Sequence, residues 1–449
     1  MPTTTSELAD YLAGAASATV PDEVLTKTAW HVLDTLAAGI SGSRLPAGQQ
    51  AAAYAAAHPA AGPAVFWGHG GTGDPQTAAL VNGMASHADE TDDSHAPSVS
   101  HPGCGVVPAA FALADGTGIP LSRLLKAVAA GYDVGPRVNL ALGRGRFEGL
   151  AGCQSSHAYA SLFGAVAAGV VVRGLNPAQA MTALSYGTQL TSGVSTWLRD
   201  GAHIEKAFVF AGMPARNGVF AVDIAEVGWP GVPDAFDHEP NFLAALGADP
   251  RPALLTDGLG HRYEVMQTNI KKYAVGSPAQ AAVQAAEDLV ATHGLPAGQI
   301  AAIEIRLPAN AAYIVDDRKM PDICVQYLVA GTLLDGGFTF AMAHDEARME
   351  SPGVRRLRDV TTLVPDETTS GTRAGTVIAS TRDGQRLRAH VADVRGTAQN
   401  PMTQDEVEAK AADLLEPVLG KQQALELIAR VLDPAGTDLA GLTALLARR

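Results

Sequence analysis

Alanine-rich segments between about residues 21 and 260 most constrain what this chain can fold into. They follow one another as apolar stretches with helical periodicity, each opened by a proline or a capping residue and closed near a glycine, as in PDEVLTKTAWHVLDTLAAGI and NPAQAMTALSYGTQL. Hydrophobic residues make up 47% of the chain and aromatic residues only 5%, a composition that suits closely packed helices with small side chains. The sequence therefore predicts a mainly α protein.

The pattern changes after about residue 268. The stretch IAAIEIRLP alternates like a β-strand, and TVIASTRDGQRLRAHV contains two strand-like runs joined by Asp383-Gly384, which is a strong hairpin signal. Amphipathic helical patterns return after Pro401, in TQDEVEAKAADLLEPVLG and KQQALELIARVLD. At 449 residues the chain is long enough for two domains. We expect an all-α helical domain built from residues 1–268 and 398–449, and a smaller α+β domain from residues 269–397.

Charge and cysteine content exclude several classes of partner. A formal net charge of −14, without any run of Lys or Arg, argues against binding to nucleic acid or to an anionic membrane surface. A small anionic substrate is compatible with it, because a buried pocket can gather a few cations. The three cysteines are widely spaced, which predicts neither a disulfide framework nor a zinc finger. The N-terminus has no signal-peptide pattern and no apolar stretch reaches membrane-spanning length, so we expect a cytoplasmic protein.

Polar residues concentrate in the stretch HADETDDSHAPSVSHPG, inside an otherwise apolar region. It contains His87, Asp89, Glu90, Asp92, Asp93, Ser94, His95 and His101. Histidines interleaved with carboxylates are typical of a wall of an active site that handles protons, although a solvated acidic loop is the alternative. We also expect His101-Pro102-Gly103 to lie just before a helix with Pro108 in its first turn. Free amides there would favour an anion.

A metal site is a second interpretation of this stretch, because His, Asp and Glu side chains at these spacings could ligate zinc or iron. The stretch lacks the HExxH pattern of zinc proteases and the glycine and terminal glutamate of an EF-hand loop. We therefore expect no metal in this stretch.

Two candidates for the chemistry lie on later helical segments. His157 falls in the first turn of a helix capped by Ser155 or Ser156, where the helix dipole favours a neutral imidazole that can act as a base or a hydrogen-bond donor. Lys206 lies in the apolar stretch HIEKAFVFAG, as a pocket cation or as an edge residue that reaches solvent. Taken alone, each residue is better explained by a surface role.

Three further candidates come from the second half of the chain. Lys271 and Lys272 lie at the junction of the two predicted domains, and such junctions commonly form pockets. Tyr327 belongs to the amphipathic stretch DICVQYLVAGTLLDGG, whose pattern alone favours a packing role over an acid role.

Two motif-like patterns are discounted. Residues 68–73 (GHGGTG) fit GxGxxG, but no βαβ alternation follows, so we interpret them as a turn. The chain also lacks the GxSxG pattern of a nucleophile elbow.

Together, several motifs resemble the MmgE/PrpD family, which includes 2-methylcitrate dehydratase, cis-aconitate decarboxylase and an iminodisuccinate epimerase. They are HVLDTLAAGISGS, ALVNGMASHADETDDSH with SHPGCGVVPAA, SSHAYASLFGAVAAG, EKAFVFAGMPARNGVFA, TNIKKYAVGSPAQ and ICVQYLVAGTLLDGG. The resemblance implies a large all-α domain from both chain ends, a smaller α+β lid domain and a homodimer. It also implies an active site in the cleft between the domains, without metal or organic cofactor.

The resemblance further implies a set of site residues. The acidic, hydroxyl and first histidine positions of the family's decarboxylases fall on Glu90, Ser94 and His101; the second histidine, the two lysines and the tyrosine fall on His157, Lys206, Lys271 and Tyr327. This chain departs from the family pattern in having Glu90 for the usual Asp and Ser94 for the usual Thr. It also has Gly276 where related decarboxylases carry a lid histidine, and Ala274-Val275 where many dehydratases carry Pro-Cys.

The resulting hypothesis is a cofactor-independent lyase acting on a small di- or tricarboxylate, with dehydration or hydration as the leading reaction. His101 or His157 would remove a proton next to a carboxylate that Lys206 and Lys271 bind, and Tyr327 or a lysine would protonate the leaving hydroxyl. Glu90, Asp93, Ser94 and Lys272 would bind substrate or support these groups. The alternatives are decarboxylation of the cis-aconitate type, epimerisation of the iminodisuccinate type, a metal-dependent hydrolase and a non-catalytic helical scaffold.

Overall fold

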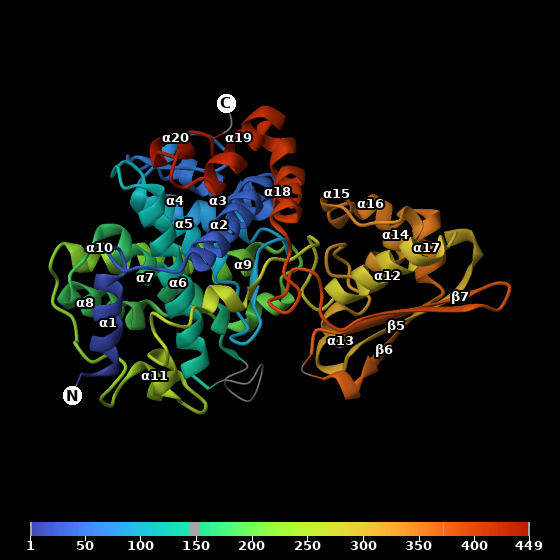
Figure 1. The fold of residues 1–449 in the computed structure, drawn as a ribbon, viewed down its shortest axis with the longest axis horizontal. Coiled ribbons are helices and arrows are strands. Elements are labelled where there is room, and N and C mark those ends of the chain that lie inside the picture. Colours follow the sequence, from blue (N-terminus) through green and yellow to red (C-terminus); the bar gives the residue numbers. More distant parts are fainter. Residues whose placement is uncertain (1, 144–152, 371, 448–449) are drawn as a thin grey trace. The chain divides into compact units, whose positions relative to one another are not determined.

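The computed structural model describes residues 2–143, 153–370 and 372–447 (Figure 1). The chain divides into two compact units. The helical unit comprises residues 1–88, 92–269 and 403–449, and the α+β unit comprises residues 89–91 and 270–402. The short segment 89–91 thus groups with the α+β unit although both of its neighbours in sequence belong to the helical unit.

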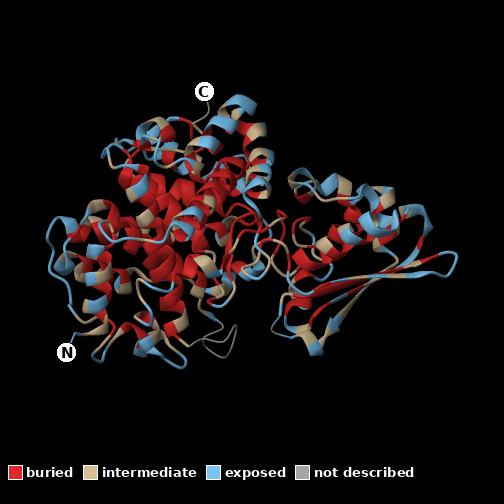
Figure 2. Cartoon of the chain, viewed as in Figure 1, coloured by how far each residue is buried: buried red, intermediate tan, exposed pale blue. Residues whose placement is uncertain are grey.

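The helical unit confirms the prediction of a mainly α protein. Its longer helices are α1 (Thr4–Gly14), α2 (Asp22–Gly42), α3 (Pro46–Ala57), α4 (Pro75–Ser86), α5 (Gly103–Ala114), α6 (Leu121–Ala141), α7 (Ser156–Arg173), α8 (Pro177–Leu190) and α10 (Met213–Glu226). Helix α7 packs against α5, α6 and α10, and every residue from His157 to Val172 is buried, so this helix lies in the core (Figure 2).

Glycine and alanine allow the central helices to approach closely. A Cβ on Gly164 of α7 would lie 2.5 Å from Val106 Cγ2 and 2.9 Å from the Gly131 carbonyl oxygen of α6. A Cβ on Gly135 of α6 would overlap the Ala160 carbonyl oxygen. The alanine-rich composition is therefore a packing requirement, because larger side chains at these contacts would force the helices apart.

The C-terminal helices complete the same unit. Helices α18 (Gln404–Leu419) and α19 (Lys421–Leu432) pack against α2, close to the chain start in sequence, and both were predicted from their amphipathic pattern. Lys410 of α18 pairs with Asp34 of α2, with Nζ 2.5 Å from Oδ1 and both side chains at most 9% exposed. Burial raises the pKa of Asp34 to about 6, although the Lys410 charge opposes that rise.

The α+β unit contains, among the described residues, a four-stranded sheet in the order β6-β5-β7-β8. The strands are β5 (Ile300–Pro308), β6 (Thr361–Asp366), β7 (Gly375–Thr381) and β8 (Arg386–Val391). Strand β6 is parallel to β5, whereas β7 is antiparallel to β5 and β8, and the hairpin predicted at Asp383-Gly384 joins β7 to β8. Gly384 has φ +87°, a value that suits glycine in such a turn.

Helices cover one face of this sheet, as Figure 1 shows for α12, α14 and α17. The helices of the unit are α12 (Gln280–His293), α13 (Ala309–Val315), α14 (Val325–Asp335), α15 (Phe340–Ala343), α16 (Glu346–Met349) and α17 (Pro352–Arg358). Side chains of β8 alternate between exposed and partly buried, which is typical of a strand with one solvated face.

Three local predictions have different outcomes. The turn predicted within residues 68–73 is confirmed up to Gly71, since the chain turns there between the short antiparallel strands β1 (Ala64–Val65) and β2 (Thr72–Gly73), without a βαβ unit. The prediction that His101-Pro102-Gly103 leads into a helix is confirmed, since α5 begins at Gly103, whose amide donates to Asp93. The prediction that Pro108 lies in the first turn is wrong, because Pro108 lies inside the helix. The Asp93 carboxylate accepts from the first turn of α5, so the helix begins at Gly103, five residues before Pro108.

Among the described residues, no helix is long and apolar enough to span a bilayer.

Candidate active site

A buried carboxylate joins two histidines of the helical unit. Asp92 Oδ2 lies 2.8 Å from Nδ1 of His87, the residue at the C-terminal end of α4, and Asp92 Oδ1 lies 3.3 Å from Nδ1 of His101. His87 and Asp92 are fully buried, whereas the His101 side chain is 12% exposed. His101 lies two residues before α5, so its ring is held where the chain enters a buried helix.

The neighbouring carboxylate, Asp93, has a different set of partners. Its Oδ2 accepts hydrogen bonds from His31 Nδ1 of α2 at 2.8 Å and from the Tyr132 hydroxyl of α6 at 2.6 Å, and its Oδ1 accepts from the Gly103 amide at 3.1 Å. The Asp93 carbonyl oxygen lies 2.6 Å from His101 Nδ1. Asp93 therefore contacts His101 through its backbone, while its side chain ties the segment to three helices.

His157 and Lys206 both lie beside the ring of Phe210. Phe210 lies in a π-helical turn, Phe208–Gly212, and its ring stacks on His157 with centroids 4.0 Å apart and on His87 with centroids 4.8 Å apart. Lys206 Nζ lies 5.3 Å from the Phe210 ring centroid and 5.7 Å from that of Trp197. A π-bulge is a recurrent feature of functional sites because it redirects side chains within a helix.

The structure thus brings three of the predicted residues together in the helical unit: His101, His157 and Lys206. The His101 and His157 rings are 5.8 Å apart, and the His101 and His87 rings are 5.0 Å apart. Burial, reinforced by nearby positive charge, lowers the pKa of His87 despite its bond to Asp92. His87 is therefore a neutral hydrogen-bond donor to Asp92 at physiological pH.

Ser94 lies in the same unit but in a different setting. It forms the short strand β3 (Ser94–His95), which pairs with β4 (Thr268–Asn269), and it is 7% exposed. The adjacent His95 contacts Ser98 Oγ at 2.7 Å and Glu264 Oε2 at 3.1 Å, which ties the loop to the chain preceding the α+β unit.

Glu90 and Lys271 belong to the α+β unit. Lys271 Nζ donates to the Glu90 carbonyl oxygen at 2.8 Å and lies 3.6 Å from the Glu90 carboxylate, and both residues are 4% exposed. Lys272 instead pairs with Glu287 at 2.7 Å and covers the Tyr273 ring. The two adjacent lysines therefore have separate environments, and Lys272 supports the packing of α12.

Tyr327, on α14 of the same unit, is fully buried and donates its hydroxyl proton to the Met342 carbonyl at 2.7 Å. Burial raises the pKa of Tyr327 to about 12. Both observations agree with the packing alternative that its helical pattern offered.

An ion pair that the sequence did not indicate joins Asp89, in the segment 89–91, to His344 of the same α+β unit. His344 Nε2 lies 2.9 Å from Asp89 Oδ2, and its Nδ1 lies 2.9 Å from the Phe340 carbonyl oxygen. The Phe340 carbonyl only accepts, so Nδ1 carries a proton, and the Asp89 carboxylate beside Nε2 favours the imidazolium form of His344. Burial opposes this charge, but the Asp89 carboxylate outweighs it and raises the pKa of His344 to about 9.

This pair predicts a pH-dependent loss of stability. A folded-state pKa above the unfolded value of about 6.5 means that the contribution is fully present below pH 6.5 and is lost as pH rises through 9. We expect the free energy of unfolding to fall by about 2–3 kcal/mol between pH 6.5 and 9.5. Urea denaturation across this range measures it. The variant His344→Gln should lose this dependence, and parallel pH profiles for the two proteins would exclude the assignment.

A potential metal-binding group lies beside the histidines. Among the described residues, the ligand atoms of His87, Asp92 and Cys104 lie within 4.8 Å of one another and all three residues are buried. Nitrogen, oxygen and sulfur ligands of this kind suit zinc. In the present arrangement His87 bonds Asp92, and Cys104 Sγ lies 3.1 Å from the His101 carbonyl oxygen as a weak donor.

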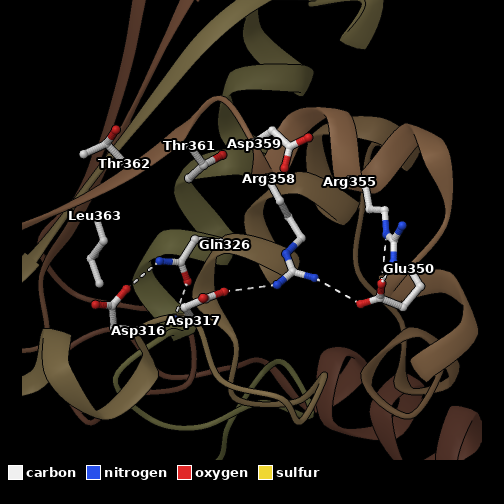
Figure 3. Close-up of a pocket in the computed structure, with 10 residues that line it drawn as sticks. All are labelled: Asp316, Asp317, Gln326, Glu350, Arg355, Arg358, Asp359, Thr361, Thr362 and Leu363. Carbon is white, nitrogen blue, oxygen red and sulfur yellow. Dashed lines mark hydrogen bonds and ion pairs between the residues drawn. The ribbon is translucent and has the colours of Figure 1, made fainter.

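The α+β unit also has an open pocket of about 740 Å³, drawn in Figure 3. Its cations are already paired: Arg358 contacts Asp317 at 3.2 Å and Glu350 at 3.6 Å, and Arg355 also pairs with Glu350. It contains none of the predicted site residues, so it offers no alternative site for their chemistry.

Comparison with known proteins agrees with this architecture. Residues 6–255 match the MmgE/PrpD N-terminal domain, and residues 273–434 match the MmgE/PrpD C-terminal domain. The chain therefore belongs to the MmgE/PrpD family, as the sequence motifs indicated.

Curated relatives cover nearly the whole chain at low identity. The cis-aconitate decarboxylase-like protein oryM of Aspergillus oryzae is 25% identical over 98% of this chain and 97% of its own length. A cis-aconitate decarboxylase of Aspergillus terreus is 24% identical over 98% of this chain and 95% of its own. The cis-aconitate decarboxylase of Homo sapiens is 26% identical over 90% of this chain and 86% of its own length.

Proposed function

We propose that this protein is a cofactor-independent lyase that acts on a small di- or tricarboxylate and begins by removing a proton next to a carboxylate. The observation that carries the proposal is the meeting of His101, His157 and Lys206 around Phe210 in the helical unit. Two imidazoles supply a base, and a lysine ammonium in apolar surroundings supplies a counter-charge for an anionic substrate.

The leading reaction is dehydration. His101 takes the proton from carbon, the C–H electron pair forms a carbon–carbon double bond, and the C–O bond breaks as the hydroxyl leaves with a second proton as water. Lys206 stabilises the charge that develops on the carboxylate during proton removal. It is also a candidate for the acid, since Tyr327 already donates its proton to the Met342 carbonyl. Lys271 keeps the carboxylate-binding role, and Glu90 and Ser94 keep the supporting roles, that the family resemblance implies.

Decarboxylation is the second candidate, because the three relatives above carry names of that activity. In that reaction a C–C bond breaks, carbon dioxide leaves and a protonated group returns a proton to carbon. The resemblance places Gly276 at the position of a lid histidine in related decarboxylases. A Cβ at Gly276 would lie 3.2 Å from Ile323 Cγ1, so Ile323 occupies the space beside this glycine. The absence of that imidazole favours dehydration.

The test is incubation with 2-methylcitrate, cis-aconitate and iminodisuccinate, as well as related polycarboxylates, in deuterated water, followed by proton NMR and carbon dioxide measurement. Interconversion of hydroxy acid and alkene without carbon dioxide supports dehydration. Carbon dioxide release supports decarboxylation, and deuterium exchange alone supports epimerisation. If none of these polycarboxylates exchanges a proton or is turned over, the proposed function is wrong.

Chelation separates this proposal from a metal-dependent hydrolase. We expect prolonged dialysis against EDTA to leave turnover unchanged within about twofold, because imidazole and ammonium groups supply the chemistry. Turnover that is lost on dialysis and restored by added zinc would instead assign the chemistry to a metal held by His87, Asp92 and Cys104.

We also propose a homodimer, on the family resemblance alone. Light scattering should then give a mass of twice 46.2 kDa for the purified chain. A mass of 46.2 kDa at micromolar concentration would contradict it.

A further inference from the structure

We infer that Trp197 is a positioning residue: it holds the His157 imidazole and the Lys206 ammonium beside Phe210, so that one carboxylate substrate meets an imidazole and a positive charge together. The inference rests on the proposed function, which assigns the chemistry to this group, and adds a residue that neither the sequence motifs nor the family resemblance indicated. Three observations carry it: the burial of Trp197, its ring contacts and the way its segment is bonded at both ends.

Trp197 is the buried residue of an otherwise exposed connection. It lies in the 3₁₀ turn Ser195–Arg199, between α8 and the short helix α9 (Ile204–Ala207). Its neighbours Thr196 and Leu198 are exposed, whereas Trp197 is 9% exposed. Burying an indole removes a large apolar surface from water, so this side chain anchors the connection to the helices beneath it.

The indole contacts both polar groups of the site and the ring between them. Its centroid lies 4.7 Å from that of Phe210 and 5.8 Å from that of His157, and in both pairs the rings are nearly perpendicular, which is a favoured geometry for aromatic rings. Lys206 Nζ lies 5.7 Å from the Trp197 centroid and 5.3 Å from the Phe210 centroid. Within about 6 Å a ring attracts a cation, so two rings together hold the ammonium.

A hydrogen bond fixes the indole to the helix that carries His157. Trp197 Nε1 donates to Ser155 Oγ at 3.2 Å, and Ser155 is the N-cap residue of α7, whose first turn contains His157. The Ser155 side chain makes no capping bond to a helix amide, so its hydroxyl serves the indole instead. The Ser155 amide donates to the Gly193 carbonyl at 3.1 Å, which holds the start of the connection at the same place.

The other end of the connection is bonded to the start of α9. Asp200 accepts from the Ala202 amide at 2.9 Å and from the Lys206 amide at 3.1 Å, and the Thr196 hydroxyl donates to Glu205 at 2.6 Å. The chain from Trp197 to Lys206 is therefore tied to α7 at one end and to α9 at the other. A displaced indole changes the positions of His157 and Lys206 relative to each other.

The kinetic test uses the full-length protein and a polycarboxylate that it turns over. Trp197→Leu keeps an apolar side chain but removes the ring and the Nε1 donor, so KM should rise about tenfold as the ammonium loses its position for the substrate carboxylate. Trp197→Phe retains a ring for the ammonium and should recover most of this increase. In a Lys206→Met background, Trp197→Leu should change KM by less than about twofold, because the group through which it acts is already absent.

The matched control is Trp229→Leu. Trp229 belongs to the same unit, but it is 53% exposed and its ring contacts Tyr186 rather than a candidate site residue. This variant should keep the wild-type KM and kcat.

Fluorine NMR provides a test without substrate and covers the case in which Trp197→Leu does not fold. The protein is labelled with 5-fluorotryptophan, and the Trp197 signal among the four tryptophans is the one lost in Trp197→Phe. Lys206→Met and Ser155→Ala should each move the Trp197 signal, because they remove the cation and the acceptor that contact the indole. The signals of Trp67 and Trp229 should stay in place.

An equal rise of KM for Trp197→Leu with and without Lys206, or an unmoved Trp197 signal in folded Lys206→Met, would overturn the inference. A moved signal in a protein that turns over none of the polycarboxylates would reject the proposed function and still support the placement of Lys206 by Trp197.

Discussion

Replacing His101 with asparagine lowers kcat on the polycarboxylate substrate by about 10³-fold, the range that a positioned general base contributes. The asparagine side-chain amide reproduces the Nδ1 donor and can still reach the Asp93 carbonyl, which His101 Nδ1 approaches to 2.6 Å. The substitution therefore removes the basic Nε2 and keeps the local packing. Turnover is measured by proton NMR at saturating substrate, with circular dichroism to verify folding.

His238→Asn is the control for this experiment, because the His238 side chain is 77% exposed in the same unit. It should retain wild-type kcat. Activity of His101→Asn within tenfold of wild type would contradict the assignment. A larger loss in His157→Asn than in His101→Asn would assign the base to His157, which lies 5.8 Å away between ring centroids.

Replacing Lys410 with methionine destabilises the helical unit by about 3–5 kcal/mol at pH 7, because it leaves the Asp34 carboxylate buried without its cation. Methionine keeps an unbranched apolar side chain between α18 and α2, so the lost charge dominates. Urea denaturation followed by circular dichroism measures the change.

The pH dependence distinguishes this cause from lost packing. Burial already raises the pKa of Asp34 to about 6 with Lys410 present, so without Lys410 the carboxyl remains protonated to a higher pH. In Lys410→Met the buried Asp34 carboxyl is neutral at low pH and becomes a buried, unpaired charge as pH rises. The loss of unfolding free energy caused by the substitution should therefore be smaller at pH 5 than at pH 7. The double variant Asp34→Leu with Lys410→Met should recover most of the stability at pH 7. An equal loss at pH 5 and pH 7 would exclude the charge explanation.

The helices and strands could be predicted from the sequence because their signals are local. The alanine-rich periodicity indicated α2 and α8, the alternation of IAAIEIRLP indicated β5, and Asp383-Gly384 indicated the hairpin of β7 and β8. The sequence indicated that a helix follows His101-Pro102-Gly103, but it could not show that Asp93 accepts from the Gly103 amide, because the orientation of Asp93 depends on His31 and Tyr132 from two other helices.

Candidate site residues could be named from the sequence, but their contacts could not. Asp92 and Asp93 are adjacent identical residues, and no sequence pattern distinguishes them. In the structure Asp92 faces His87 and His101, whereas the Asp93 side chain faces His31 and Tyr132. Neither His344 beside Asp89 nor Phe210 beside His157 had a signal in the sequence, because each pair is far apart along the chain.

The sequence by itself determined the helical class, the family and a short list of histidines, lysines and carboxylates, since composition, periodicity and motifs are properties of neighbouring residues. The tertiary structure alone decided which of these side chains share a proton, an acceptor or a charge. Such pairing depends on distances of about 3 Å between residues from different elements, and only the packing of helices against one another sets those distances.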